Sequence, residues 1–178
     1  MIPFPNKKYN IIYADPAWTF KTYSNKGKSR SPEKHYNCMT IQDIYNLPVQ
    51  DISEDNCILL IWVVNPMLPE AIKTIESWGF KYKTVAFTWV KSNKTKGFFT
   101  GMGYWTRANP EMCLLATKGK VSRLSKSVKQ LIISKRREHS RKPDEIRDRI
   151  VQLVGDLPRI ELFARHKTKG WDCWGNEV

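Results

Sequence analysis

Cysteine is scarce in this sequence, and its few copies lie far apart. The four residues are Cys38, Cys57, Cys113 and Cys173, and no two of them form a C-x-x-C pair. Structural zinc sites need cysteine or histidine ligands at short, regular spacings. The sequence therefore predicts no metal site and favours partly buried free thiols.

The sequence also has no apolar run long enough to cross a bilayer. Its longest is Cys57–Val64, whereas a membrane-spanning helix needs about 20 apolar residues. The first residues contain two prolines and the pair Lys7-Lys8 rather than the apolar core of a signal peptide. No basic amphipathic helix of the membrane-surface kind stands out. We therefore expect a soluble, cytoplasmic protein with no membrane partner.

Acidic residues are strongly outnumbered by basic ones. The chain of 178 residues has 17 Asp and Glu against 30 Lys and Arg, which gives a formal net charge of +13. Ten of the basic residues fall between Lys118 and Lys142, together with one acid, Glu138. A solvated charged face is one explanation of such a run. Its concentration favours contact with phosphates, so we expect a polyanionic partner, with nucleic acid first.

The hydrophobic pattern predicts one α/β domain that covers residues 1–178. Short apolar or β-branched runs, typical of strands buried in a sheet, alternate with amphipathic segments typical of helices. This alternation favours a doubly wound, Rossmann-like sheet. Strands are expected at 9–14, 57–64, 82–90, 112–117, 128–134 and 159–163, and helices from Thr40 towards Leu47, from about Met67 to Gly79 and from Pro143 to Gly155.

The first predicted strand is followed by Asp15-Pro16-Ala17-Trp18. In open α/β sheets, ligands bind beyond the carboxyl ends of the strands. The Asp15 carboxylate and the Pro16 carbonyl can each accept a hydrogen bond, and Trp18 offers a face on which a flipped base can stack. These groups suit a flat ring that carries an exocyclic amine. The alternative is a strand-ending turn with a structural tryptophan.

Two long polar segments, 19–37 and 93–109, combine basic and aromatic residues. Such mixtures are typical of loops that contact nucleic acid. Plain solvated loops are the competing explanation, and an oligomer contact explains the second segment nearly as well. The candidate substrate contacts are Lys21, Lys28, Arg30 and Tyr36 in the first segment and Trp105 and Arg107 in the second.

Four motifs together resemble one family. They are Asp15-Pro16-Ala17-Trp18, Lys142-Pro143-Asp144-Glu145, Ile160-Glu161-Leu162-Phe163-Ala164-Arg165 and Trp174-Gly175-Asn176-Glu177. From about Lys8 to its end, the chain resembles the adenine N6-methyltransferases that include the catalytic subunit of the eukaryotic messenger-RNA adenosine methyltransferase. It is more similar to the small bacterial and phage members, usually described as adenine-specific DNA methyltransferases. As in the permuted class of these enzymes, the catalytic motif comes first and the cofactor strand last.

The resemblance implies S-adenosylmethionine as the cofactor and a catalytic site formed by Asp15, Pro16 and Trp18. Asp15 would also lie close to the methionine part of the cofactor. Lys142 would hold the methionine carboxylate, a role that suits its charge just before a helix. Ala17 replaces a proline that is usual in the family, and we expect activity to survive with a looser loop.

Further residues receive roles from the resemblance alone. Phe163 and Arg165 would line the cofactor pocket, and Asn176 with Glu177 would bind the ribose hydroxyls. Glu111, Trp105 and Arg107 fall in the region that corresponds to the family's substrate-contacting loop.

The resemblance thus implies methylation of the N6 amine of adenine in DNA, in the cytoplasm of a bacterium or of the host of a phage. The same reaction on RNA is one alternative, because the motifs report the amine and not the sugar. A non-catalytic nucleic-acid-binding subunit of this fold is another. The sequence is compatible with a homodimer but has no feature that requires one.

Overall fold

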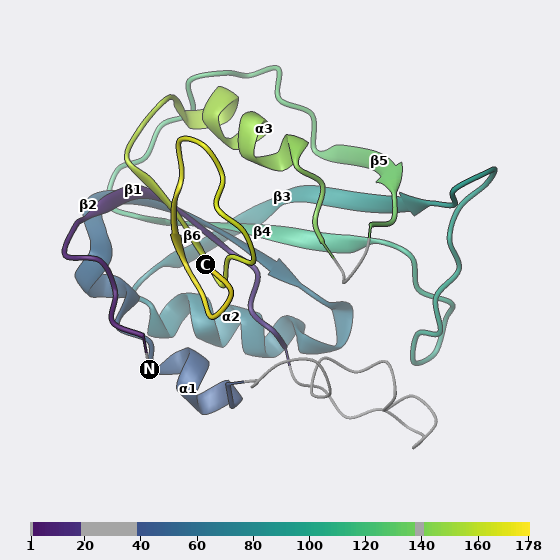
Figure 1. Cartoon of the computed structure of the whole chain (residues 1–178), viewed down its shortest axis with the longest axis horizontal. Coiled ribbons are helices and arrows are strands. Elements are labelled where there is room, and N and C mark those ends of the chain that lie inside the picture. The colour runs from purple at the N-terminus through teal and green to yellow at the C-terminus, as the bar shows by residue number, and fades with distance from the viewer. Residues whose placement is uncertain (1, 19–38, 138–140) are drawn as a thin grey trace.

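A computed structural model describes residues 2–18, 39–137 and 141–178, which form a seven-stranded sheet with helices on both faces (Figure 1). The strands are β1 (Tyr9–Ala14), β2 (Ser53–Val63), β3 (Lys81–Ser92), β4 (Glu111–Lys118), β5 (Leu131–Lys135), β6 (Arg159–Leu162) and β7 (Asp172–Trp174). The helices are α1 (Ile41–Tyr45), α2 (Leu68–Ser77) and α3 (Glu145–Val154), with short 3-10 turns at Val49–Ile52 and Asn65–Met67. The predicted Rossmann-like α/β class is confirmed.

The strand order β5-β3-β4-β2-β1-β6-β7 brings most strand ends to one edge of the sheet. Every neighbouring pair is parallel except the two pairs that involve β4. The carboxyl ends of the other six strands therefore lie along the same edge, and β4 begins there. β1 has β2 on one side and β6 on the other, so it lies where the chain order reverses, which is the favoured ligand site in such sheets.

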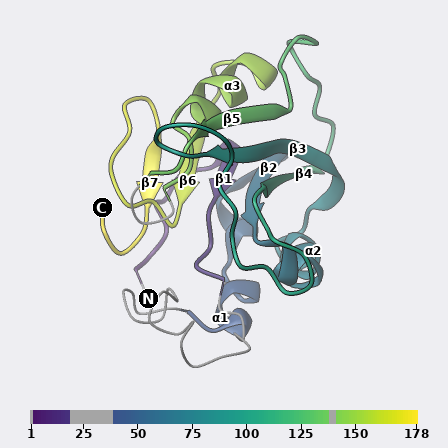
Figure 2. The ribbon, with the colours of Figure 1, turned by 90° about the vertical axis from the view of Figure 1, so that its right-hand side faces the viewer.

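Two apolar clusters hold the helices against opposite faces of the sheet (Figure 2). Adjacent residues of a strand point to opposite faces, and Leu59 and Leu60 of β2 accordingly belong to different clusters. The first cluster packs α1 and α2 on the sheet, and the second packs α3. Both faces of β2 are thus buried, as its continuous apolar run predicts.

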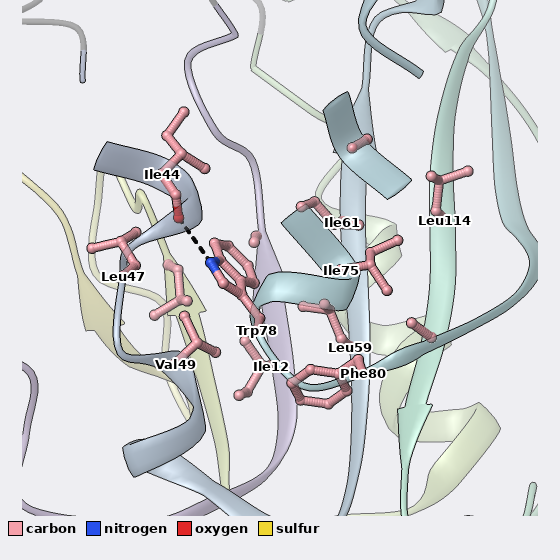
Figure 3. Packing of buried hydrophobic residues seen from close by; sticks show 14 of the residues in the cluster. Ile12, Ile44, Leu47, Val49, Leu59, Ile61, Ile75, Trp78, Phe80 and Leu114 are labelled. Carbon is pink, nitrogen blue, oxygen red and sulfur yellow. Dashed lines mark hydrogen bonds between the residues drawn. The ribbon is translucent and has the colours of Figure 1, made fainter. Parts of the chain in front are cut away.

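Helix α1 begins as the sequence indicates. Thr40 and Asp43 form a capping box, in which each side chain bonds to the other residue's backbone N–H. The Nε1–H of Trp78, at the end of α2, donates to the Ile44 carbonyl over 2.8 Å (Figure 3). Gly79 follows with a φ of 80°, the left-handed conformation expected at a helix end. The hydrogen bond from Trp78 to Ile44 thus joins α1 to α2 on one face of the sheet.

The structure corrects four sequence expectations. Helix α3 begins at Glu145 rather than at Pro143, and the Asp144 carboxylate bonds to Arg141 and does not cap the helix. β2 begins at Ser53, four residues before its predicted start at residue 57. β5 begins at Leu131, three residues after its predicted start at residue 128. The tail, for which no element was expected, adds β7 beside β6. In the described parts of the chain, no helix has the length and apolarity needed to cross a membrane.

A buried ion pair joins α3 to β6. Arg147 donates from Nε and Nη2 to the two carboxylate oxygens of Glu161, each over 2.7 Å, and both side chains are 8% exposed. Such a two-pronged pair compensates two charges that would be expensive to bury singly. It fixes the helix above the carboxyl end of the strand that leads into the tail.

We expect Glu161→Gln to lower the free energy of unfolding by about 3 kcal/mol, because it leaves the buried Arg147 guanidinium without its carboxylate. Urea denaturation followed by circular dichroism would measure the loss. Glu145→Gln is the matched control: its partner Arg149 lies four residues further along the same helix at the surface, where such pairs contribute about 0.3–0.5 kcal/mol. Equal losses of stability in the two variants would show that Glu161 does not compensate a buried charge on Arg147.

Candidate active site

Charged residues from four segments converge at the carboxyl edge of the sheet. Asp15 follows β1, and Lys91 lies near the end of β3. Glu111 is the first residue of β4, and this reversed strand begins where its neighbours end. Lys142 lies between β5 and α3. Residues far apart in the sequence therefore meet because the strand directions bring them to one edge.

The Lys142 ammonium is the centre of this cluster. Its Nζ lies 2.8 Å from each carboxylate oxygen of Asp15 and 3.3 Å from Oε2 of Glu111. Lys91 Nζ donates to Oε1 of Glu111 over 2.5 Å. The Lys142 side chain is 10% exposed and that of Asp15 is 23% exposed. The network alternates in charge from Asp15 through Lys142 and Glu111 to Lys91.

Burial and charge act in opposite directions on the pKa values of this network. Burial alone would raise the pKa of Glu111, but Lys142 and Lys91 outweigh it and lower that pKa below its ordinary value of 4.5. Burial alone would lower the pKa of Lys142, but Asp15 and Glu111 raise it above 10.5. Glu111 and Lys142 therefore stay charged across the neutral range.

Two cavities adjoin Asp15. The larger, of about 230 Å³, is lined by Tyr13, Asp15, Arg141, Lys142, Arg147, Glu161, Phe163, Arg165, His166 and Glu177. The smaller, of about 70 Å³, is lined by Asp15, Ala17, Met39, Ile44, Phe163, Ala164, Arg165, Trp174, Gly175, Asn176 and Glu177. Asp15, Phe163, Arg165 and Glu177 line both. The structure thus brings together all six residues expected at a cofactor.

The chain after β6 takes an unusual path into this site. Phe163 has a φ of 61°, a backbone conformation that residues other than glycine seldom adopt. Its ring meets that of Trp174 edge-on, with centroids 5.6 Å apart. A Cβ on Gly175 would lie 2.3 Å from the Ala164 carbonyl oxygen. Only glycine therefore allows the tail to pass this close to the end of β6, where it brings Asn176 and Glu177 to the cavities.

The structure corrects the expected exposure of Trp18. Its side chain is 4% exposed within the first apolar cluster, and its Nε1–H donates to the Trp62 carbonyl over 2.7 Å. The Pro16 carbonyl accepts the Trp18 backbone N–H over 2.8 Å, and its second lone pair can take another donor. Stacking of a base on Trp18 stays a prediction, and it requires the ring to leave this position.

The expected substrate residues fall in different places. Glu111 belongs to the buried network, whereas Trp105 is 97% exposed. Arg107 is exposed, and its guanidinium lies 3.6 Å from the Met102 sulfur. The structure therefore does not bring Trp105 and Arg107 to the cavities. Lys21, Lys28, Arg30 and Tyr36 lie outside the described residues.

Sequence reasoning missed several residues of the site. Lys91, which bonds to Glu111, lies one residue beyond the strand predicted at 82–90 and was given no role. His166, Arg141 and the pair Arg147–Glu161 line the larger cavity. The available signal was Glu161 between the apolar residues of β6 and Lys91 directly after the apolar part of β3. Such charges are rarely buried without partners. Finding the partners required the strand order.

The lining has the groups that S-adenosylmethionine would need. Lys142 and Arg165 are cationic and suit its carboxylate, and Asp15, Asn176 and Glu177 offer oxygen acceptors for its ammonium and hydroxyl groups. Phe163 adds an aromatic surface shared by both cavities. Within the described ranges, no three His, Cys, Asp or Glu side chains are grouped so that they could hold a metal ion.

Comparison with known proteins gives consistent matches. The model of the MT-A70 family matches residues 9–177. The type II methyltransferase M.MunI of a Mycoplasma species is 37% identical over 98% of this chain and 79% of its own length. A putative N(6)-adenosine-methyltransferase MT-A70-like protein of Medicago truncatula is 30% identical, and the N(6)-adenosine-methyltransferase catalytic subunit METTL3 of Homo sapiens is 27% identical. Each of these two matches covers 96% of this chain, which spans only 26% and 28% of the respective proteins.

We expect Glu111→Gln to lower the free energy of unfolding by about 3 kcal/mol at pH 7, because Lys91 and Lys142 both lose an anionic partner. The lowered pKa of Glu111 means that its contribution is present above pH 4.5 and is lost as the pH falls further. The raised pKa of Lys142 means that its contribution is present below pH 10.5 and is lost as the pH rises further. The difference between wild type and variant should stay constant between these limits.

Urea denaturation of both proteins across this pH range would measure that difference. Glu76→Gln, on the exposed surface of α2, is the control and should change stability little at any pH. A wild-type advantage that already shrinks near pH 6 would show that Glu111 does not have a lowered pKa.

Proposed function

The chain belongs to the MT-A70 family of methyltransferases, and we propose that it transfers a methyl group from S-adenosylmethionine to the N6 amine of adenine in DNA. The observation that carries the proposal is the position of Asp15. Its carboxylate lines both cavities, bonds to Lys142 and lies at the reversal point of the sheet. A cofactor and a substrate amine could therefore both reach this one side chain.

Lys142 is the residue we propose for the cofactor carboxylate. It now bonds to Asp15 and Glu111, and Glu111 has a second partner in Lys91. A carboxylate that entered the larger cavity would give Lys142 a new anionic partner while Glu111 kept Lys91. The two Asp15 oxygens would then be available to a donor from the substrate.

Asp15 and Pro16 would prepare the target nitrogen. The N6 lone pair of adenine is delocalised into the ring and is a poor nucleophile. The Asp15 carboxylate and the Pro16 carbonyl can accept the two amine hydrogens, which favours a more pyramidal nitrogen. S-adenosylmethionine supplies an electrophilic methyl group on a sulfonium. Positioning of the amine by Asp15 and Pro16 can therefore lower much of the activation barrier, an effect that reaches ~7–11 kcal/mol in well-oriented systems.

Comparison with relatives favours DNA over RNA. The type II methyltransferase is matched along 79% of its length, and the small bacterial members that this chain resembles are usually described as DNA methyltransferases. RNA is the second candidate, because several relatives are named N(6)-adenosine-methyltransferases. The chain spans only about a quarter of those proteins. A partner role without catalysis is less favoured, since it would not need Asp15, Lys142 and Glu177 around one pair of cavities.

We expect Asp15→Asn to lower the rate of methyl transfer about 100- to 1000-fold, a range typical of losing one preorganised polar contact to the reacting group. The amide has the same size but only one acceptor oxygen and no charge. Transfer of labelled methyl to random-sequence duplex DNA, single-stranded DNA and RNA would measure the rate and the substrate class. Equilibrium dialysis would measure the affinity for S-adenosylmethionine, which we expect to stay within tenfold of the wild-type value.

Asp51→Asn is the matched control, because this exposed carboxylate precedes β2 and lies away from the carboxyl edge. It should leave transfer unchanged. Undiminished transfer by Asp15→Asn would reject the proposed mechanism. Transfer to RNA alone would move the substrate to RNA, and cofactor or nucleic-acid binding without any transfer would favour the non-catalytic role.

A further inference from the structure

A basic pocket lies beside the candidate active site, where β3 and β5 end. It has a volume of about 510 Å³ and is lined by Ser92, Asn93, Lys94, Arg136, Arg137 and Arg141. Four of these six residues are cationic, and none is acidic. Arg141 also lines the larger cavity beside Asp15. The two spaces are therefore neighbours along the same edge of the sheet.

All three arginines of the pocket are held in place by other groups. Arg137 and Arg141 both bond to the Asp144 carboxylate, the latter over 3.0 Å. The Arg136 guanidinium lies 3.8 Å from the centroid of the Phe99 ring. Guanidinium groups that are fixed in advance lose less freedom when they bind a ligand. The pocket is thus organised, although its four cationic residues are exposed.

Phe99 belongs to a connection between β3 and β4 that is itself fastened at its base. The Asn109 side chain accepts the Lys91 N–H over 2.8 Å and donates to the Lys91 and Phe99 carbonyls over 2.9 and 2.5 Å. Phe99 N–H in turn donates to the Lys91 carbonyl over 2.9 Å. The surface under Arg136 is therefore tied to the strand that carries Lys91 and, through it, to Glu111.

We propose that this pocket, formed by Lys94, Arg136, Arg137 and Arg141, binds backbone phosphates of the polynucleotide strand on one side of the target adenine. The inference rests on the proposed function for the identity of that strand. Asp144 supplies one negative charge beside four cations. The like charges in the concavity therefore still repel one another, and an anion that enters relieves this repulsion. Planar guanidinium groups match the paired oxygens of a phosphate.

The strand order sets how far these phosphates lie from the target. β3 is three strand positions from β1, and β5 is four. At about 4.8 Å per position, the ends of β3 and β5, which Lys94 and Arg136 follow, lie about 14–19 Å from the end of β1 along the edge. Arg141 is closer, since it also lines the larger cavity beside Asp15. A stacked strand advances about 3.4 Å per nucleotide. Lys94 and Arg136, on the far side of the pocket, should therefore contact phosphates about four to six nucleotides from the adenine.

The first test is the salt dependence of binding to a fluorescent oligonucleotide. The double variant Lys94→Ala/Arg136→Ala removes two cations from the pocket. We expect the slope of log affinity against log salt to become shallower by about 1.4–1.8, at 0.7–0.9 per phosphate contact. Arg136→Lys, which keeps the charge, should keep the wild-type slope. Lys81→Ala/Lys83→Ala makes the same change in net charge at the opposite end of β3 and should also keep that slope.

The second test uses oligonucleotides shortened from either side of a single adenine. Wild-type affinity should fall steeply when one particular side is cut below about four nucleotides, and the double variant should not respond to that cut. An unchanged salt slope in the double variant, or equal responses to the cut, would overturn the proposal. So would binding of wild type to phosphatidylserine vesicles but not to oligonucleotides.

These measurements also separate this inference from the proposed function. Binding slopes need no methyl transfer, so they remain informative if the protein proves inactive. Methyl transfer that is normal in wild type, together with a slope unaffected by the double variant, would reject the pocket alone. S-adenosylmethionine affinity, which the double variant should leave unchanged, checks that the neighbouring cavity is intact.

Discussion

The Lys142 ammonium connects the parts of this protein that matter for its proposed chemistry. It joins the segment before α3 to the residue after β1 and to the first residue of β4. A charge this buried needs anionic partners, and it has them only while those three segments stay together. The same interaction therefore stabilises the carboxyl edge of the sheet and holds the Asp15 carboxylate in position. Folding and the preparation of the site depend on one set of contacts.

The direction of β4 makes this arrangement reachable. A wholly parallel sheet would have placed the first residue of that strand at the opposite edge, about the full length of a strand away from Lys142. Because β4 is reversed, Glu111 opens the strand at the site and Lys91 approaches from the end of β3. The remaining parallel strands still provide the reversal point at β1, where Asp15 lies between the two halves of the sheet.

Much of the fold could be predicted from the sequence because its signals are local. The apolar runs of β1 and β2, the capping box at Thr40 and the stop at Gly79 each act over a few residues. β7 could not be predicted, because it is a strand only through its pairing with β6. The burial of Trp18 depends on a carbonyl 44 residues away. In the site, Asp15 and Lys142 were found through motifs, whereas Lys91 needed the observed pairing of β3 with β4.

The connection between β3 and β4 leaves and re-enters the sheet at the same edge, fastened at its base by Asn109. A closed connection of this kind can change in length at little entropic cost, since each doubling adds only about 0.6 kcal/mol. Substituting the residues at the tip of this connection would leave the Asn109 contacts and the network of Lys91, Glu111 and Lys142 in place. The substrate contacts predicted for Trp105 and Arg107 of this hairpin could therefore change during evolution without any change in the charged network below it.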